Sequence, residues 1–332
     1  MQVLMRWLTL FAACAAPCAY ALTFPIDKNT EVVGEVITFK AKYEDTFPEY
    51  GRTYDMGAYA LQRANPGVDE WIPGEGTKIT IPSAFILPPE TRTGIVINLP
   101  ELRLYYFHPN GKEVSTYPIG IGKAGWSTPI TSGKVTDKTA NPTWVVPASI
   151  LQEHKVSGEP IPGLVNGTHV PPGADNPLGK YRLRLSIPGY LLHGTNSSVG
   201  VGRRVTHGCV RMFAPDIEQL FNNVAVGTPV TIVHDPIKLG WRNDELYLEV
   251  HPTLEEHPIS DHARKVQLID KMEKTLGNTH AYIDWDLVHN MMTAQTGVAQ
   301  AIASLHEKKP EAKADEEKPA EEKSNQKKKS QK

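Results

Sequence analysis

THGCVRM, at residues 206–212, is the stretch of this chain that says most about its fold and its chemistry. It places Cys209 directly after a histidine and a glycine, and a second histidine, His193, lies upstream in the stretch HGTN (193–196). A thiol with nearby histidines and glycines is typical of enzymes that transfer acyl groups through a cysteine. The alternative is a buried cysteine that serves as a small apolar residue, and these neighbours disfavour it.

The N-terminal end has the pattern of an export signal. A basic start is followed by an apolar run that is too short to span a membrane, and the small-residue site AYA (19–21) predicts cleavage before Leu22. Cleavage there removes Cys14 and Cys18 and leaves Cys209 as the one cysteine of the mature chain. An unpaired thiol is a liability in an oxidising compartment, so its retention indicates a function.

Lipidation at Cys14 is the alternative fate of this end, and the aromatic Phe11 disfavours it because the lipoprotein signal begins with an aliphatic residue. A chain without cysteine pairs must build its core by packing, and 332 residues are enough for two or more domains. The net charge of −2 argues against a nucleic-acid partner. Residues 306–332 are rich in Glu, Lys, Ala and Pro, and we predict a disordered tail there.

Residues 35–82 have the pattern of a small α+β module. A strand is expected at 36–40, and the stretch 53–64 has the apolar spacing of a helix. The turn NPG (65–67) and a strand at 78–82 close the unit. We therefore expect a separate folded module ahead of Cys209 and its surroundings.

This module resembles a LysM module. The matching motifs are RANPGV (63–68), WIPG (71–74) and ITIP (79–82), whereas EDT (44–46) stands where the family has Gly-Asp-Thr and Pro48 interrupts the first helix. The resemblance implies that the module binds glycans containing N-acetylglucosamine and retains the protein on peptidoglycan. The alternative is a packing domain that has lost its binding surface.

Residues 93–234 are predicted to form a mainly β domain. β-branched and aromatic runs at 95–99 and 102–107 precede an Asn-Gly pair, which is a strong hairpin signal. A short helix is expected at 216–221, directly after THGCVRM. Further strands are expected at 114–121, 181–185 and 229–233.

The order of short motifs through this domain is similar to the L,D-transpeptidase catalytic domain, also called the YkuD domain. The motifs are NL (98–99), RLYY (103–106), YPIGIG (117–122), LHGT (192–195) and THGCVRM (206–212). The resemblance implies a β-sandwich-like catalytic domain. The layout with a LysM-like module first is similar to the ErfK-type subgroup of Gram-negative bacteria, which implies location in the periplasm.

The resemblance implies acyl transfer on the tetrapeptide stems of peptidoglycan. In this family a cysteine attacks the stem, releases D-Ala and forms a thioester, which an amine acceptor then resolves; carbapenems acylate the same thiol. The acceptor stays open: it is a second stem, giving a 3→3 cross-link, the terminal lysine of an outer-membrane lipoprotein, or water or a free D-amino acid. The family needs no cofactor for this reaction.

The same resemblance implies roles for the residues around Cys209, the nucleophile. His193 matches the proton donor and acceptor, while His207 either orients the site or serves as an alternative base. The N–H groups of Gly208 and Cys209 are the expected oxyanion donors, and Arg211 is expected to pair with a substrate carboxylate. The expected substrate-binding residues are Tyr190, Gly194, Thr195 and Thr206.

Three other functions compete with acyl transfer. A cysteine endopeptidase of another type is disfavoured because the sequence has no papain-like Cys-Trp segment. A zinc site built from Cys209, His193 and His207 is disfavoured because no pair of ligands has a typical zinc spacing. A non-catalytic peptidoglycan-binding wall protein, which keeps the fold as a scaffold, is the alternative to an enzyme. The sequence does not decide the oligomeric state.

Residues 240–305 are expected to form a partly helical extension after the catalytic domain. The stretch 240–250 has the apolar content of a last strand or docking arm. Helical spacing follows at 261–276 and again from 284 to 305. We expect these helices to pack on the catalytic domain.

Overall fold

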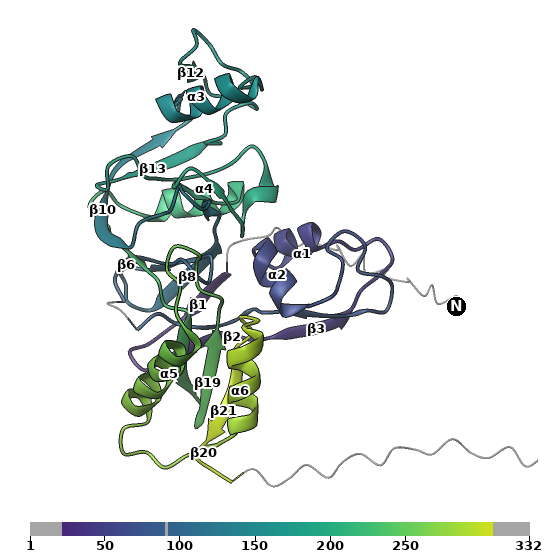
Figure 1. Ribbon diagram of the computed structural model, residues 1–332. Helices are drawn as coiled ribbons and strands as arrows, with labels where there is room; N and C mark the ends of the chain where they lie inside the picture. The colour runs from purple at the N-terminus through teal and green to yellow at the C-terminus, as the bar shows by residue number, and fades with distance from the viewer. Residues whose placement is uncertain (1–21, 90–91, 308–332) are drawn as a thin grey trace, which may run out of the picture.

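The computed structural model describes residues 22–89 and 92–307, and its fold is mainly β (Figure 1). The predicted signal peptide with Cys14, and the predicted tail from residue 308 on, lie outside the described residues. Within the described ranges, no helix is both long and apolar enough to cross a membrane. Figure 1 shows a central sheet with helices α1 and α2 on one side and a separate unit with α5 and α6 at one end.

The main sheet has nine strands, and a single strand, β10, joins its two halves. In chain order the strands are β1 (Leu22–Pro25), β6 (Gly94–Asn98), β7 (Arg103–Phe107), β8 (Glu113–Pro118), β10 (Thr131–Ala140), β13 (Tyr181–Leu185), β14 (Leu191–His193), β16 (Val210–Arg211) and β17 (Pro229–Val233). Their spatial order is β1-β8-β7-β6-β17-β10-β13-β14-β16. The first part of β10 pairs with β17 and its second part with β13, and the register shifts between Val135 and Asp137. This irregularity bends the sheet and supports the expected sandwich-like form.

Apolar side chains are buried on both faces of this sheet. On one face Ile95, Ile97 and Leu104 pack with Ile217 and Leu220 of helix α4 (Ala214–Asn223). The strands that carry these side chains are buried along their whole length, which explains their continuous runs of β-branched and aromatic residues. The expected helix after THGCVRM is thus confirmed, and it covers the face next to Cys209.

The predicted small module packs on the other face of the main sheet. Its elements are β3 (Ile37–Lys40), α1 (Phe47–Thr53), α2 (Ala58–Ala64) and β4 (Lys78–Ile81). Two short strands that pair with each other, β2 (Val32–Gly34) and β5 (Ala84–Ile86), lie just outside the predicted bounds of 35–82. Phe47 and Leu61 share one core with Val96 and Tyr105 of the sheet. The helical pattern expected at 53–64 begins only at Ala58, because Asp55 has a positive φ of 53° and separates α2 from α1. Pro48 does not interrupt the first helix but lies in its first turn.

The C-terminal extension contains a sheet that the sequence did not predict. Its elements are β18 (Ile237–Arg242), β19 (Glu245–Val250), α5 (Asp261–Leu276), β20 (Tyr282–Ile283), α6 (Trp285–Ala294) and β21 (Gln300–Ser304), with strand order β18-β19-β21-β20. The helix expected over 284–305 ends at Ala294, because Gln295 takes the left-handed conformation. The remaining residues form β21, whose Ile302 and Ala303 enter the core of this unit.

A small unit is inserted between β10 and β13, and it stands at one end of these strands in Figure 1. Its elements are β11 (Trp144–Val145), α3 (Ala148–Ser157) and β12 (His169–Val170). It has a core of its own around Val146, Ile150 and Val170. A second pair of short strands, β9 (Ile121–Gly122) and β15 (Arg204–Thr206), lies next to the segment that carries Cys209.

Candidate active site

Cys209 lies one residue before β16, at the edge of the main sheet. β16 runs parallel to β14, with Leu192 opposite Val210 and His193 opposite Arg211. Residues two apart on a strand share a face of the sheet. The register therefore places Cys209, Arg211 and His193 on the same face of two hydrogen-bonded strands, although the sequence separates the two strands by a long loop.

The backbone around Cys209 is held by the hydroxyl of Thr206. The Thr206 hydroxyl donates to the carbonyl of Cys209 at 2.6 Å and accepts from the N–H of Gly208 at 3.2 Å. Gly208 has φ of +102°, a conformation that favours glycine. The hydroxyl of Thr128 donates to the Gly208 carbonyl at 2.7 Å, so both the N–H and the carbonyl of Gly208 are hydrogen-bonded to threonine side chains.

These bonds change one expected role. The Gly208 N–H was expected to stabilise an oxyanion, but it donates to Thr206 instead. In the part of the chain that the structure describes, the N–H of Cys209 has no acceptor. The Cys209 N–H therefore remains free for a developing negative charge, and Thr206 contacts the backbone of the loop.

His193 is buried at the end of β14, with 5% of its surface exposed. Its Nδ1 lies 2.6 Å from the carbonyl oxygen of Gly194. A carbonyl only accepts, so Nδ1 carries the proton of the neutral ring and Nε2 is the basic nitrogen. Burial and the nearby charge of Arg211 lower the pKa of His193 to about 4, while hydrogen bonds to the carbonyls of Gly194 and Pro177 oppose this shift. At neutral pH the ring is therefore neutral and able to accept a proton.

The thiol of Cys209 is also neutral in this structure. Burial raises its pKa, and the N–H of Leu191 opposes that shift. The sulfur donates to the carbonyl of Gly189 at 3.6 Å, and not to His193. The register of β14 and β16 brings the thiol and the imidazole to one face, but the hydrogen bond of the thiol goes to Gly189 and not to His193.

His207 faces away from this pair. Its Nε2 lies 2.6 Å from a carboxylate oxygen of Glu153 in α3, and its ring meets that of Trp126 edge-on at 4.8 Å. Lys123 contacts the same carboxylate at 2.9 Å. Hydrogen bonds from Lys123 and then His207 lower the pKa of Glu153 to about 2. His207 thus connects the cysteine loop to the inserted unit, a contact for which the sequence offered no signal.

Arg211 presents a positive charge that no carboxylate neutralises. Its Nε is buried and has no hydrogen-bond partner within the described residues, and no salt bridge there includes it. One of its terminal nitrogens lies so close to Gly200 that a Cβ there would come within 2.5 Å of it. Burial lowers the pKa of Arg211 but leaves it charged at neutral pH. A guanidinium in this state can hold a carboxylate of an incoming molecule.

The other expected substrate-binding residues have structural partners. Tyr190 packs its ring on Gly208, where a Cβ would come within 2.8 Å of Cε1, and its hydroxyl donates to the Ser127 carbonyl at 3.2 Å. The Thr195 hydroxyl donates to the carbonyl of Ser197 at 2.8 Å and accepts its N–H at 3.0 Å, which forms a local turn. Gly194 supplies the carbonyl that orients His193. Of these, Tyr190 lies nearest the cysteine loop.

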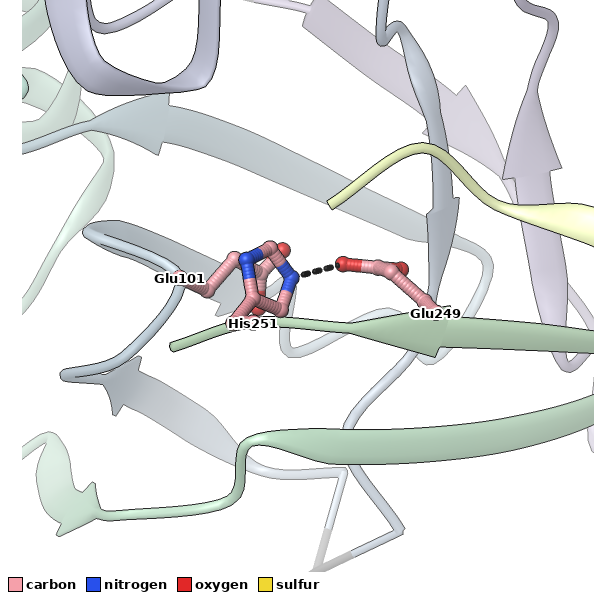
Figure 2. A group of neighbouring side chains, drawn as sticks. All are labelled: Glu101, Glu249 and His251. Atoms are coloured by element: carbon pink, nitrogen blue, oxygen red, sulfur yellow. Dashed lines mark hydrogen bonds and ion pairs between the residues drawn. The ribbon is translucent and has the colours of Figure 1, made fainter. Parts of the chain in front are cut away.

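A cluster of possible metal ligands occurs elsewhere, at the junction with the C-terminal sheet. Figure 2 shows Glu101, Glu249 and His251, whose ligand atoms all lie within 4.8 Å of one another. The ammonium of Lys238 already lies among them, 2.8 Å from Glu101 and 3.0 Å from Glu249. Burial opposes the charge of Lys238, but the two carboxylates raise its pKa. An ammonium group thus already occupies the space among these ligand atoms, and we interpret the cluster as a structural ion network rather than a metal site.

A curled sheet that carries a thiol, a neutral imidazole and an unpaired guanidinium on neighbouring strands has the chemistry of a cysteine acyltransferase. The family model of the L,D-transpeptidase catalytic domain, YkuD, matches residues 92–232. The chain therefore carries that domain in the part of the sequence where the motifs predict it.

Relatives of similar length extend the match. The probable L,D-transpeptidase YcfS of Escherichia coli K12 is 38% identical over 308 residues, which cover 88% of this chain and 93% of that protein. The probable L,D-transpeptidase YbiS of the same strain is 40% identical over 75% of this chain and 83% of that protein. Among solved structures, L,D-transpeptidase 3 from Mycobacterium tuberculosis matches with a TM-score of 0.33 and 17% identity, over 65% of this chain and 99% of that one. The chain belongs to the L,D-transpeptidase family and is an acyltransferase of the ErfK type.

Proposed function

We propose that the protein is exported to the periplasm and transfers acyl groups from the tetrapeptide stems of peptidoglycan. The observation that carries the proposal is the register of β14 and β16, which brings Cys209, His193 and Arg211 to one face. In the proposed reaction the Cys209 sulfur attacks the carbonyl of the stem while His193 Nε2 takes the thiol proton. The C–N bond to the terminal D-Ala breaks, its amine takes the proton from His193, and a thioester remains on Cys209.

Each remaining group has a part in this reaction that its environment supports. The free N–H of Cys209 holds the oxyanion, a kind of contact whose loss typically costs about 3–4 kcal/mol of transition-state stabilisation. The unpaired guanidinium of Arg211 holds a carboxylate of the stem. An amine acceptor then attacks the thioester, releases the thiol and forms the new amide. Arg211 next to His193 also keeps the imidazole neutral before attack.

The acceptor and the glycan contact are also part of the proposal. The acceptor is a stem amine, giving a 3→3 cross-link, or the terminal lysine of an outer-membrane lipoprotein. The LysM-like module, residues 35–82, retains the enzyme on glycan strands through the side of the module that carries Trp71 and Ile72, which are 53% and 74% exposed. Large exposed apolar side chains of this kind are typical of binding surfaces.

Product analysis with defined muropeptides tests this function. The chain that starts at Leu22 is incubated with a disaccharide tetrapeptide, and the products are separated and weighed. We expect release of D-Ala and a cross-linked dimer, and loss of both with Cys209→Ala. A lipoprotein peptide that ends in lysine, added as a competing acceptor, separates the two acceptors by the mass of the product. Binding to sacculi without any D-Ala release would favour the non-catalytic wall protein instead.

A further inference from the structure

Two buried carboxyl groups lie beside the first residue of β1. Asp55, in the turn between α1 and α2, is 4% exposed, and Asp216, in the first turn of α4, is 2% exposed. The two groups are close enough to share a hydrogen bond. One oxygen of Asp216 has no partner within the described residues. The backbone nitrogen of Leu22 points at this pair, 3.4 Å from a carboxylate oxygen of Asp55.

One cation lies beside this pair of carboxyl groups. The cation beside it is Arg103, and its N–H groups donate to the Thr116 hydroxyl and the Asp55 carbonyl, each at 3.0 Å, rather than to a carboxylate. The hydroxyl of Tyr117 is also near the two carboxyl groups. Two carboxyl groups that share a hydrogen bond hold one proton between them, which leaves a single negative charge beside the Arg103 guanidinium. Both groups can ionise only if a second cation is supplied.

We propose that this pocket is the binding site of the α-ammonium group of Leu22, which cleavage after Ala21 creates. The inference rests on the proposed export and cleavage. Water hydrolyses the Ala21–Leu22 peptide bond: its oxygen goes to the carboxyl group of Ala21, and the nitrogen of Leu22 becomes an amine that is protonated at neutral pH. An amide with a single N–H is thereby replaced by an ammonium with three donors and a full charge.

The position of Leu22 allows this pair to form without movement of the strand. Leu22 pairs with Thr116 of β8, and the hydroxyls of Thr23 and Ser115 lie 2.7 Å apart, so the first residues of β1 are already fixed in the sheet. With the ammonium in place, two carboxylates face one guanidinium and one ammonium. The buried charge is then balanced.

The ion pair also connects the new N-terminus to the catalytic edge of the sheet. Asp216 lies in α4, which begins shortly after β16 and the cysteine loop. Between them, the N–H of Met212 donates to the carbonyl of His193 at 2.9 Å. The new ion pair therefore adds a contact to the first turn of the helix that follows Cys209.

The proposed ion pair predicts how the stability difference between the cleaved and uncleaved chains depends on pH. In the uncleaved chain, burial raises the pKa of Asp55 to about 6, while burial and then Asp55 raise that of Asp216 well above its usual range. A carboxyl whose pKa is raised by folding costs stability as pH rises from about 4 through its folded pKa. The ammonium of Leu22 offsets that loss. The cleaved and uncleaved chains should therefore differ most at pH 7 and least at pH 4.5.

Three forms of the chain test the proposal without any substrate: one that begins at Leu22, one with its amine acetylated, and one preceded by Gly-Ser-Ala. We expect the free amine to give a Tm at pH 7 at least about 3 °C above both others, and the gap to shrink at pH 4.5. With Asp55→Asn and Asp216→Asn combined, the gap should vanish. Equal Tm values at pH 7, or a gap that persists in that double variant, would overturn the inference.

A direct titration covers the case in which the double variant does not fold. The α-amino group of Leu22, labelled with ¹⁵N in the otherwise unlabelled protein, should titrate above the ordinary range of about 7.7–8.0, because two carboxylates face it. A value in or below that range overturns the pairing. The mass of the N-terminal peptide of exported protein tests cleavage separately, so failure of the pairing and failure of the proposed export are distinguishable.

Discussion

The thiol of Cys209 and the imidazole of His193 are both neutral in the free protein, and each for its own reason. Burial raises the pKa of the thiol, whereas burial and Arg211 lower that of the imidazole. In a neutral pair the cysteine is protonated, whereas oxidants attack the thiolate form. In the oxidising compartment that we propose for this protein, such a neutral thiol is an advantage. The cost in the proposed reaction is that the proton must move during the attack on substrate.

This neutrality predicts a particular pH profile. Because His193 must be unprotonated to accept the proton, kcat/KM should fall only as pH drops towards about 4, and not near the usual histidine value of 6.5. Alkylation of Cys209 by iodoacetamide should stay slow at pH 7 and rise above the ordinary cysteine pKa of about 8.5. Acid loss centred near 6.5, or fast alkylation at pH 7, would argue for a thiolate–imidazolium pair instead.

Gly208 is predicted to be the glycine whose replacement damages the site most. In Gly208→Ala, the new Cβ meets the Tyr190 ring at 2.8 Å on a backbone with φ of +102°. We expect at least a tenfold loss in the rate of Cys209 acylation, because the oxyanion loop must shift. Gly227→Ala is the matched control, with φ of +96° and no atom within 4 Å of its Cβ. Gly227→Ala should lower the free energy of unfolding by about 1–2 kcal/mol and leave the rate of Cys209 acylation unchanged. Equal losses of acylation rate in both variants would contradict this role of Gly208.

At the scale of elements, side-chain contacts between α3 and the cysteine loop determine the position of the inserted unit. Lys123 and His207 both contact Glu153 of α3, and Trp126 lies against the His207 ring. Glu153 is 46% exposed at its side chain, so each contact is individually weak. Their combination holds α3 beside the cysteine loop, and the inserted unit has no other ion pair to the rest of the described chain.

We predict that Glu153→Gln frees the inserted unit while the main sheet keeps its structure. The glutamine loses the charge that both Lys123 and His207 contact, so amide exchange in α3 should speed up and the KM for stem peptides should change more than kcat. Glu159→Gln is the control, because the carboxylate of Glu159 lies just beyond α3 and has no partner in the described structure. If both variants exchange alike, the contacts of Glu153 do not hold α3.

At the scale of the whole molecule, a buried ion network joins the central sheet to the C-terminal sheet. Lys238 of β18 contacts Glu101 and Glu249, and its ammonium also donates to the Ile86 carbonyl at 2.8 Å. Glu249 in turn accepts from His251 and from the N–H of Ile86. Strands from three parts of the chain thus meet at one buried charge cluster, which fixes how they pack together.

Removal of the ammonium should be among the most destabilising single changes in the protein. Lys238→Met leaves two buried carboxylates without their cation, and we expect a loss of about 3–5 kcal/mol in the free energy of unfolding, measured in denaturant. Lys40→Met, at an exposed lysine of β3, should change it by less than about 0.5 kcal/mol. A loss below about 1 kcal/mol at Lys238 would mean that the carboxylates simply take up protons.

Much of the catalytic domain could be predicted from sequence because its signals are local. The strand at 181–185 alternates cleanly, and the motif order from 98 to 212 identifies the family. The C-terminal sheet could not be predicted in the same way. β21 lies in a stretch with helical apolar spacing, and its pairing with β19 and β20 shows that it is a strand.

The sequence predicts the residues of the site but not their partners. The roles of Cys209 and His193 stay predictions. The Glu153 contact of His207 comes from an insertion far away in the sequence. The engagement of the Gly208 N–H by Thr206 depends on one dihedral angle, which residue order does not reveal. Long-range contacts and backbone dihedral angles could therefore not be predicted from the sequence.

The most direct test of this account is the mass of the intact protein during turnover of a tetrapeptide stem without an acceptor amine. We predict a covalent adduct equal to the stem minus D-Ala, located on Cys209 by peptide mapping, absent in Cys209→Ala and strongly slowed in His193→Gln. With His207→Gln the adduct should still form, since His207 contacts Glu153 and not the thiol. An unmodified wild-type protein that has nevertheless released D-Ala, or an adduct on any other residue, would contradict it.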